Sequence, residues 1–410
     1  MRRREWLATL GGTVSASVAG CAGVSRLGSV PTETRTGPPG PVGRVNTAEL
    51  PIPRDRLTRG AARDEIAAIT QPAFGDDWSG VSVEVRVDLG QRPESDRTTV
   101  IEPRLAPDDR VIGIARGGEA RAYPLRLLVW HEVVNDTFDG SAGGTPSGRS
   151  TAAAGRPGAP TLVTYCPLCA TAVTARRTVG GHSAMFGVSG LLWRANLVMY
   201  DERTGSLWSQ VAATAIRGPH TGDRLSLVPS RLTTLAAWRD RHPDTRVLLP
   251  PPASETVRGP VTYDYRTDPY AGYEARAETG LDGTAADDRL HPKVRVLGVA
   301  HDGAARAYPL PAVREHGVVN DAVGGLPVAV AVGPEEATLV GYVRRVNGRT
   351  VRFRRGDDFL AAAGSRWDVV SGRAVDGPHE GTRLTPAGRG PLFWFTWVDF
   401  HPDTTLFGRS

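Results

Sequence analysis

The sequence predicts a mainly β protein, a β-rich α+β fold built from two tandem, duplicated barrel- or sandwich-like units. Its composition favours this class, because 48 Gly and 32 Pro among 410 residues are typical of many turns between short strands. The duplication appears when the chain is compared with itself. Residues 111–140 align with residues 296–325 without a gap, and 16 of the 30 positions are identical. Two such units in one chain predict a pseudo-twofold relation between them.

The first element, residues 1–21, has the pattern of an export signal. Three arginines follow Met1, then comes a modestly apolar stretch, and small residues precede Cys21. The run RREWL resembles the twin-arginine export signal. The run VAGC resembles a lipobox, in which cleavage leaves Cys21 as the lipid-bearing first residue. We therefore expect an exported lipoprotein, anchored to the outer face of the cytoplasmic membrane by a lipid at Cys21.

Residues 22–60 are rich in Gly, Pro, Ser, Thr and Arg, which predicts a flexible tether between the lipid and the folded body. No later segment has 18 or more consecutive apolar residues, so the lipid is the only membrane attachment that we expect. Acidic and basic residues are interspersed, and the formal charge of +5 becomes smaller once the basic signal is removed. This pattern does not favour a nucleic-acid partner.

The folded body is predicted to contain a first β-rich repeat at residues 61–250, a linker at 251–284 and a second, degenerate repeat at 285–410. Each repeat opens with alternating apolar residues interrupted by Gly-Gly or Asp-Gly, a pattern typical of a β-hairpin. Further strands are expected at the runs TLVTY, LVMYD and RVLL. One short helix is expected at Leu232–Arg241, because a proline follows at position 243.

The duplication also acts as an internal control for function. Cys166 and Cys169 of the first repeat align with Gly333 and Glu336, and the second repeat also lacks His182, Met185 and eight further residues. We therefore expect the chemistry in the first repeat. Residues that both repeats retain are expected to have mainly structural roles: His131/His316, Asn135-Asp136/Asn320-Asp321, His220/His379 and His242/His401.

The C-x-x-C motif at Cys166 and Cys169 admits three interpretations. It is a redox-active dithiol, or a pair of thiolate ligands for copper or zinc, or a static disulfide. There is no second C-x-x-C, so further metal ligands would have to be His or Met. The candidates are His131, His182, Met185 and Met199. A thioredoxin-like site is disfavoured, because strands follow the motif where a helix would be needed.

A second concentration of polar and aromatic residues follows the C-x-x-C motif. Its candidate pocket residues are Asp201, Ser206, Trp208 and Gln210. The alternative is that residues 201–205 simply form a hairpin turn. A serine hydrolase has no support, because the chain contains no G-x-S-x-G motif.

These motifs give the chain a resemblance to a known family. TYCPLCATAV, FGVSGLLWRANLVMYDERTGSLWSQ, the upstream HEVVND and the HPDT-type ending resemble the exported proteins catalogued as "domain of unknown function 3179", over about residues 60–410. The resemblance implies no established activity, substrate or fold. It does imply a recurrent pattern that includes Cys166, Cys169, His131, Asp201, Ser206 and Trp208. The chain differs at Ala170, where a glycine usually follows the second cysteine, and in a Gly/Ser/Ala-rich insertion at about 141–159, expected to be a surface loop.

Two functional hypotheses follow. In the first, an exported, lipid-anchored protein binds copper or zinc, or carries out thiol redox chemistry, at the C-x-x-C site of its first repeat. In the second, the protein is a non-catalytic extracytoplasmic binding or scaffold module with a structural disulfide. Thiol chemistry or metal binding distinguishes the first hypothesis from the second.

Overall fold

The computed structural model is mainly β, as the sequence predicts, and describes residues 47–87, 97–138, 158–281, 287–333, 335 and 338–408. Cys21, the signal, most of the predicted tether and most of the 141–159 insertion lie outside these residues. The described residues contain four short α-helices, of which the sequence predicted only the second. The helices are α1 (Leu125–His131), α2 (Leu235–Arg241), α3 (Leu310–His316) and α4 (Trp394–Phe400). None of the helices in this part of the chain is long and apolar enough to cross a membrane.

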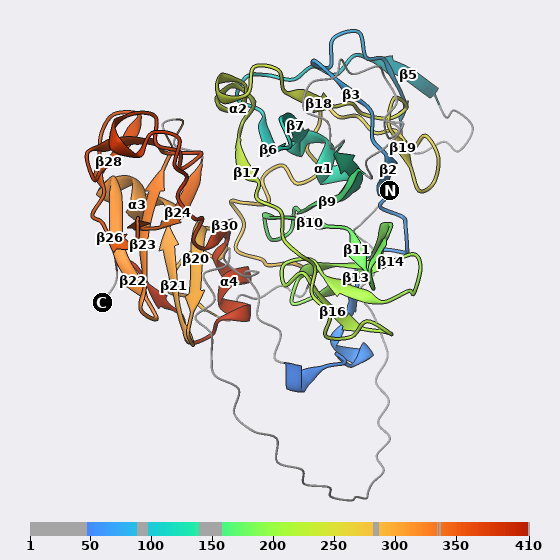
Figure 1. Cartoon of the computed structure of the whole chain (residues 1–410). Helices are drawn as coiled ribbons and strands as arrows, with labels where there is room; N and C mark the ends of the chain where they lie inside the picture. The colour runs from blue at the N-terminus through green and yellow to red at the C-terminus, as the bar shows by residue number, and fades with distance from the viewer. Residues whose placement is uncertain are drawn as a thin grey trace, which may run out of the picture. The chain divides into compact units, whose positions relative to one another are not determined.

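The predicted hairpins form the centre of a sheet that occurs in both repeats (Figure 1). The strand order is β17-β6-β7-β18-β3 in the first repeat and β30-β20-β21-β31 in the second. The hairpins turn at Gly117-Gly118 and at Asp302-Gly303, and all four residues have positive φ, as a two-residue hairpin loop requires. The strands are β3 (Phe74–Gly75), β6 (Arg110–Arg116), β7 (Glu119–Pro124), β17 (Arg231–Thr234), β18 (Arg246–Leu248), β20 (Arg295–His301), β21 (Ala304–Pro309), β30 (Arg389–Phe393) and β31 (Thr405–Leu406).

Two further kinds of sheet also occur in both repeats. The order β10-β9-β8-β2-β19 corresponds to β24-β23-β22, and the order β1-β13-β14-β15-β16 corresponds to β27-β28-β29. In the first repeat these strands are β1 (Thr58–Arg59), β2 (Ile69–Gln71), β8 (Val133–Phe138), β9 (Ala159–Cys166), β10 (Thr171–Arg176), β13 (Phe186–Trp193), β14 (Asn196–Asp201), β15 (Leu207–Ser209), β16 (Thr214–Arg217) and β19 (Glu255–Thr256). In the second repeat they are β22 (Val318–Val323), β23 (Leu326–Val332), β24 (Leu339–Val343), β27 (Arg354–Arg355), β28 (Phe359–Ala362) and β29 (Ser365–Asp368).

The described strands thus form six sheets of three to five strands and three two-stranded ribbons. The ribbons pair β4 (Val83–Val87) with β5 (Arg97–Ile101), β11 (Thr178–Val179) with β12 (His182–Ser183), and β25 (Arg345–Val346) with β26 (Arg349–Thr350). Every sheet order has two ends, so none of these sheets closes on itself. The arrangement is closer to the small blades of a propeller than to two clear barrels.

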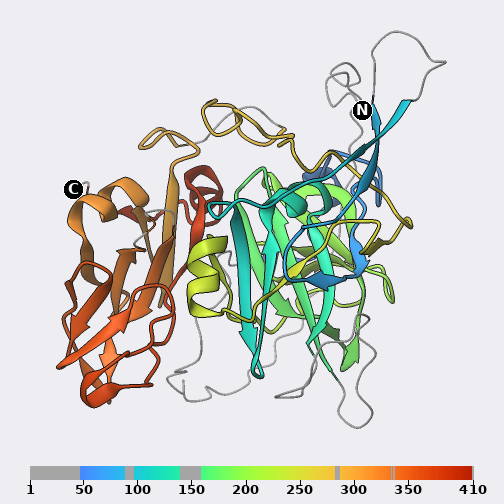
Figure 2. The same cartoon turned by 90° about the horizontal axis from the view of Figure 1, so that it is seen from above.

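Tryptophans of α2 and α4 pack on glycines of the hairpin strands. A Cβ atom at Gly113 would lie 2.4 Å from the Trp238 ring, and one at Gly298 would lie 2.1 Å from the Trp397 ring. Each indole N–H donates a hydrogen bond of 2.8 Å to a threonine hydroxyl, Thr245 or Thr404. Figure 2 shows α2 beside the strands of the first repeat. Glycine is needed at both positions because the indole occupies the space of a side chain.

The aspartates that both repeats retain accept the same hydrogen bonds. Asp136 accepts from Arg121 at 2.5 Å and from the Tyr123 hydroxyl. Its equivalent Asp321 accepts from Arg306 at 2.7 Å and from the Tyr308 hydroxyl at 2.9 Å. The first pair is buried, with side chains 5% and 3% exposed, whereas those of the second are 34% and 19% exposed. Both repeats therefore contain the same polar network, which is buried in the first repeat and partly exposed in the second.

The other retained residues also make matched contacts. Asn135 donates to and accepts from the backbone of Phe186, and Asn320 does the same with Phe353. His242 and His401, which follow α2 and α4, contact the tryptophans of those helices with ring centroids 4.1 and 4.0 Å apart and ring planes tilted by 40° and 32°. His220 and His379 stack on Trp208 and Trp367. Such contacts are structural in kind, which agrees with the retention of these residues in both repeats.

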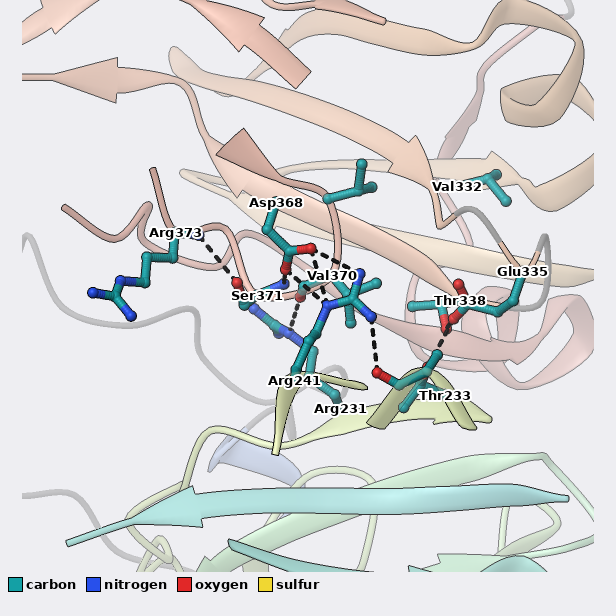
Figure 3. Close-up of polar contacts among 12 residues, drawn as sticks. Arg231, Thr233, Arg241, Val332, Glu335, Thr338, Asp368, Val370, Ser371 and Arg373 are labelled. Atoms are coloured by element: carbon teal, nitrogen blue, oxygen red, sulfur yellow. Dashed lines mark hydrogen bonds and ion pairs between the residues drawn. The ribbon is translucent and has the colours of Figure 1, made fainter. Parts of the chain in front are cut away.

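Polar contacts join the two repeats near β17 and α2 (Figure 3). Arg241 forms an ion pair of 2.7 Å with Asp368, and Arg231 donates to the backbone oxygen of Val370 at 2.6 Å. Thr233 donates to Glu335 at 2.7 Å. A cavity of about 90 Å³ is lined by residues 227–232, by most of their equivalents in the second repeat, 386–388 and 390, and by residues 338–341 among others. Equivalent segments of the two repeats thus line one cavity.

Candidate thiol site

The C-x-x-C motif is the turn between β9 and β10. Cys166, the last residue of β9, pairs with Thr171, the first residue of β10. Within the turn the amide of Cys169 donates to the backbone oxygen of Cys166 at 3.4 Å. Ala170 has a φ of 52°, in the left-handed region that favours glycine. This conformation explains why a glycine suits the position after the second cysteine, and shows that the alanine of this chain accepts the same turn.

Both cysteines are buried free thiols. Cys166 is 2% exposed and Cys169 is 0% exposed, and they belong to one apolar cluster that also contains Met199 and Trp208. No disulfide joins them, so the structural disulfide of the scaffold hypothesis is not present in the structure.

Hydrogen-bond donors surround the sulfur of Cys169. The Asn196 side-chain amide donates to this sulfur at 3.0 Å, and the Thr171 hydroxyl lies 3.0 Å from it. Cys166 forms a further hydrogen bond with Cys169. Burial opposes ionisation of Cys169, but the hydrogen bonds from Cys166, Thr171 and Asn196 outweigh it and lower the pKa of Cys169 below its usual value. Cys169 is thus the thiol that ionises first.

Cys166 has the opposite character. Burial, the hydrogen bond to Cys169 and the negative charges of Cys169 and Glu132 raise the pKa of Cys166 well above its usual value. One proton is therefore retained by the pair and remains on Cys166. A low-pKa thiolate beside a protonated thiol is the arrangement of a nucleophilic and a resolving cysteine.

Gln210 holds the donors of Cys169 in place. Its side-chain oxygen accepts from Asn196 at 2.9 Å and from Thr171 at 2.8 Å, and its nitrogen donates to Thr164 at 3.1 Å. Thr171 has one hydroxyl hydrogen, which can point either to Gln210 or to the sulfur. When Cys169 is a thiol it donates to Thr171, and when it is a thiolate the Thr171 hydroxyl can turn to donate to it. Of the predicted pocket residues, Gln210 is therefore the one linked to the cysteines.

The other predicted pocket residues form a separate network at the turn between β14 and β15. Asp201 accepts from the Trp208 indole at 2.9 Å and from the Thr204 hydroxyl at 2.8 Å. Ser206 accepts from the backbone of His220 at 3.2 Å, as its second-repeat equivalent Ser365 does from His379 at 3.1 Å. These contacts match the alternative interpretation, in which this segment is a hairpin turn.

The predicted His and Met ligands have other partners. The two ring nitrogens of His131 contact the backbone oxygen of Ala67 at 2.7 Å and the Tyr265 hydroxyl at 2.9 Å, and burial lowers the pKa of His131 to about 4. His182 is exposed on β12, and the Met185 sulfur lies 3.7 Å from Arg177. The described residues contain no group of three or more His, Cys, Asp or Glu that could hold a metal ion.

Glu132 is a buried residue near the thiols that the sequence analysis did not identify. It follows α1, is 6% exposed and has a φ of 58°. The equivalent residue at the end of α3 is Gly317, with a φ of 74°. A glutamate in the left-handed region is unfavourable by about 1 kcal/mol or more relative to glycine, and such positions are concentrated at functional sites. The alignment of the repeats could have identified Glu132, because it pairs this glutamate with Gly317, the residue type that a positive φ favours.

Residues of the predicted linker and the second repeat cover the outer side of the turn. The Tyr273 hydroxyl donates to the backbone oxygen of Leu168 at 3.0 Å, and the amide of Phe393 donates to that of Cys169 at 3.1 Å. Lys293, the only lysine in the chain, lies 4.0 Å from the Tyr273 ring and donates to two backbone oxygens of residues 276 and 278. The linker therefore forms a wall of the site, which composition alone did not indicate.

Comparison with known proteins gives one family. A family model described as "Protein of unknown function (DUF3179)" matches residues 63–144 and 155–404. Neither the curated proteins nor the solved structures gave a match. The matched residues include both cysteines, the donors around Cys169 and most of the second repeat.

Proposed function

Because the chain belongs to the DUF3179 family, whose description names no activity, we propose its function from the site: it is an exported, lipid-anchored protein that carries out thiol redox chemistry at Cys166 and Cys169. The observation that carries the proposal is the set of polar groups around the buried Cys169 sulfur. The Asn196 side-chain amide donates to the sulfur at 3.0 Å, and the Thr171 hydroxyl, which can turn toward it, lies 3.0 Å away. A cysteine that served only as apolar filling would not need these donors.

The proposed reaction is the reduction of a small disulfide by the dithiol. The Cys169 thiolate attacks one sulfur of the substrate, forms a mixed disulfide and releases the first thiolate. The Cys166 sulfur then attacks Cys169, releases the second substrate sulfur and transfers its proton to it. The substrate disulfide is reduced to two thiol equivalents, and the protein dithiol is oxidised to the Cys166–Cys169 disulfide.

The burial of both sulfurs limits the substrate in this proposal. Cys169 is fully buried, and Tyr273 contacts the backbone of its turn. A substrate must therefore be small, or the wall formed by the linker must move to admit it. This selectivity fits an extracytoplasmic location, where an accessible dithiol would be oxidised without selection.

We propose the cellular and domain organisation on the sequence patterns. The lipid at Cys21 would hold the protein at the outer face of the cytoplasmic membrane. The tether, expected over residues 22–60, would end earlier than residue 60, because Ile52 is buried in the core and Thr58–Arg59 form β1. The first repeat (61–250) and the second (285–410) would then be related by a pseudo-twofold axis. The matched sheets, and the equivalent residues 227–232 and 386–388 and 390 that line one cavity, support this relation.

Binding of copper or zinc by the two thiolates is the second candidate. The hydrogen bond between Cys166 and Cys169 places the two sulfurs close together, which suits chelation of a soft metal. Among the proposed further ligands, Met199 shares the apolar cluster of the cysteines. Elemental analysis of anaerobically purified protein tests this candidate. Equal metal uptake by the wild type and Cys166→Ser rejects it.

The thiolate absorbance of the folded protein as a function of pH tests the redox proposal without requiring access to the sulfur. We expect a thiolate that forms below the usual cysteine range, is lost in Cys169→Ser and persists in Cys166→Ser, because serine also donates a hydrogen bond. Asn196→Ala should raise the pKa of Cys169, since a hydrogen-bond donor to the thiolate is lost. The control Asn320→Ala removes a side-chain amide from the second repeat, away from the thiols, and should leave the pKa of Cys169 unchanged.

Oxidation by hydroxyethyl disulfide completes the test. Mass spectrometry should find the Cys166–Cys169 disulfide, with two thiols released for each disulfide formed. A Cys169 that titrates in the ordinary cysteine range, or a folded protein that releases no thiol while the unfolded chain does, would contradict the proposal.

A further inference from the structure

Two arginines occupy equivalent positions in the two repeats. Arg110 is the first residue of β6 and Arg295 is the first residue of β20, and the aligned segments begin at the residue that follows each of them. The charges of Arg110 and Arg295 are close enough to act on each other, and both act on Tyr165. Equivalent strand starts thus bring two guanidinium charges within electrostatic range of each other.

The two arginines differ in their partners. Arg295 forms an ion pair with Glu274 of the linker, a side chain that is 55% exposed. In contrast, one terminal nitrogen of Arg110 is fully buried and has no hydrogen-bond partner. A buried N–H group without an acceptor costs about 1–3 kcal/mol, and more when it is charged. The described residues therefore supply one exposed carboxylate to two neighbouring guanidinium groups.

The charge on Arg110 persists despite these surroundings. Burial and the nearby charge of Arg295 lower the pKa of Arg110 to about 10, which leaves the group protonated at neutral pH. An unpartnered guanidinium nitrogen beside a second guanidinium group requires a negative charge for compensation. Arginine is also the residue best suited to oxyanions, because its N–H groups match two oxygens at once.

We propose that Arg110 and Arg295 together bind the carboxylate or other oxyanion group of a small molecule, which displaces Glu274 from Arg295. This pseudo-symmetric anion site lies beside the thiol site. Arg295 packs 5.8 Å above the Phe393 ring, the amide of Phe393 donates to the backbone oxygen of Cys169, and Tyr165 precedes Cys166 in β9. The anion site exists independently of thiol chemistry, and it would hold an acidic small molecule next to the cysteines.

Binding of sulfate, phosphate and succinate tests the proposal, with chloride at equal ionic strength as the reference. The readout is the rise in melting temperature with anion concentration, which gives an apparent Kd. We expect saturable stabilisation of the wild type. Arg110→Gln and Arg295→Gln should each weaken binding by about tenfold or more, the loss of one charge-assisted contact. Arg203→Gln, a control at an exposed arginine, should bind as the wild type does.

A second variant keeps the test decisive if the arginine variants fold poorly. Glu274→Gln removes the competing carboxylate and should tighten binding about threefold, which a damaged fold cannot imitate. Cys169→Ser should bind with wild-type affinity, so failure of the thiol proposal does not remove the anion site. Stronger binding of succinate than of sulfate or phosphate assigns the site to carboxylates, and the reverse order assigns it to tetrahedral oxyanions. Stabilisation that is equal in the wild type and both arginine variants, or absent from the wild type, overturns the proposal.

Discussion

The aspartate network that occurs in both repeats allows one substitution to be compared at two depths. Asp136→Asn and Asp321→Asn remove the same carboxylate charge from the same kinds of partner, an arginine, a tyrosine hydroxyl and the following backbone amide. The two sites differ in burial, since Asp136 is 3% exposed and Asp321 is 19% exposed. Any difference in the loss of stability therefore reports on desolvation.

The structure sets the expected sizes. Removing one partner of a buried ion pair costs about 3–5 kcal/mol, because the remaining charge stays buried. Arg121 keeps its ion pair with Glu119, 2.5 Å away. We therefore expect Asp136→Asn to lower the free energy of unfolding by about 3 kcal/mol, the lower end of this range. The side chain of Arg306 is 34% exposed and can recover water contacts, so we expect Asp321→Asn to cost about 1 kcal/mol. The predicted difference is about 2 kcal/mol, from the same estimates.

Urea unfolding followed by circular dichroism and tryptophan fluorescence measures both losses. The matched control is Asp403→Asn, an exposed aspartate that should leave the midpoint unchanged. If the two probes separate the unfolding of the repeats, each variant should shift the transition of its own repeat. A loss for Asp321→Asn equal to or larger than that for Asp136→Asn would show that burial does not govern this network.

Three further predictions concern stability. Gly113→Ala and Gly298→Ala should each cost about 1–3 kcal/mol by overpacking against the indoles of Trp238 and Trp397, and an unchanged melting temperature would contradict the packing. Asp368→Asn should cost about 1 kcal/mol at neutral pH. Burial raises the pKa of Asp368, but hydrogen bonds from Arg241 and Ser371 outweigh this effect and lower that pKa below its ordinary value of 3.8. The carboxylate of Asp368 therefore stabilises the fold fully above pH 3.8, and this stabilisation disappears as the pH falls through the lowered pKa. Acid titrations of the wild type and variant should therefore converge at low pH. Finally, the pKa of His131 is about 4 in the folded protein, below its ordinary value of 6.5. Between pH 6.5 and 4 the unfolded chain therefore binds this proton before the folded protein does, and the free energy of unfolding of the wild type should fall by up to about 3 kcal/mol. His131→Gln should remove that part of the urea-midpoint profile, and an unchanged slope would exclude the histidine as its source.

Alignment of the chain with itself predicted much of the fold. The two hairpins, the strands within β9, β14 and β18, and α2, which begins three residues later than predicted, follow from local patterns of alternation and turn residues. Helices α1 and α3 were missed because seven residues give too few turns for an apolar period to be recognised and no proline follows them. Helix α4 ends before a His-Pro pair, as α2 does, so the signal that predicted α2 was also present there. The sheet orders depend on which strands pair across the chain, which periodicity does not specify.

The candidate site was predicted only in part. The C-x-x-C motif marked the cysteines, but it could not show that Cys169 would be the residue held by Asn196 and Thr171, because these donors come from strands that only the fold brings together. Gln210 was selected for its position beside aromatics and proved to connect those donors. Arg110 and Arg295 were overlooked since each stands one position before the aligned segment. The wall formed by Tyr273 and Lys293 was missed because Tyr273 belongs to a linker that has no repeat partner and Lys293 precedes the aligned segment of the second repeat.

The hydrogen bond from the Phe393 amide to the Cys169 carbonyl has a consequence for how the two halves of the gene can diverge. This bond joins main-chain atoms and constrains the course of β30, and the buried Phe393 side chain belongs to the same apolar cluster as the two cysteines. The second half could therefore lose its own cysteines and remain necessary to the first. An excised first half would lack a bracing strand at its thiol turn, so the two halves would be inherited as a single module despite their origin as copies.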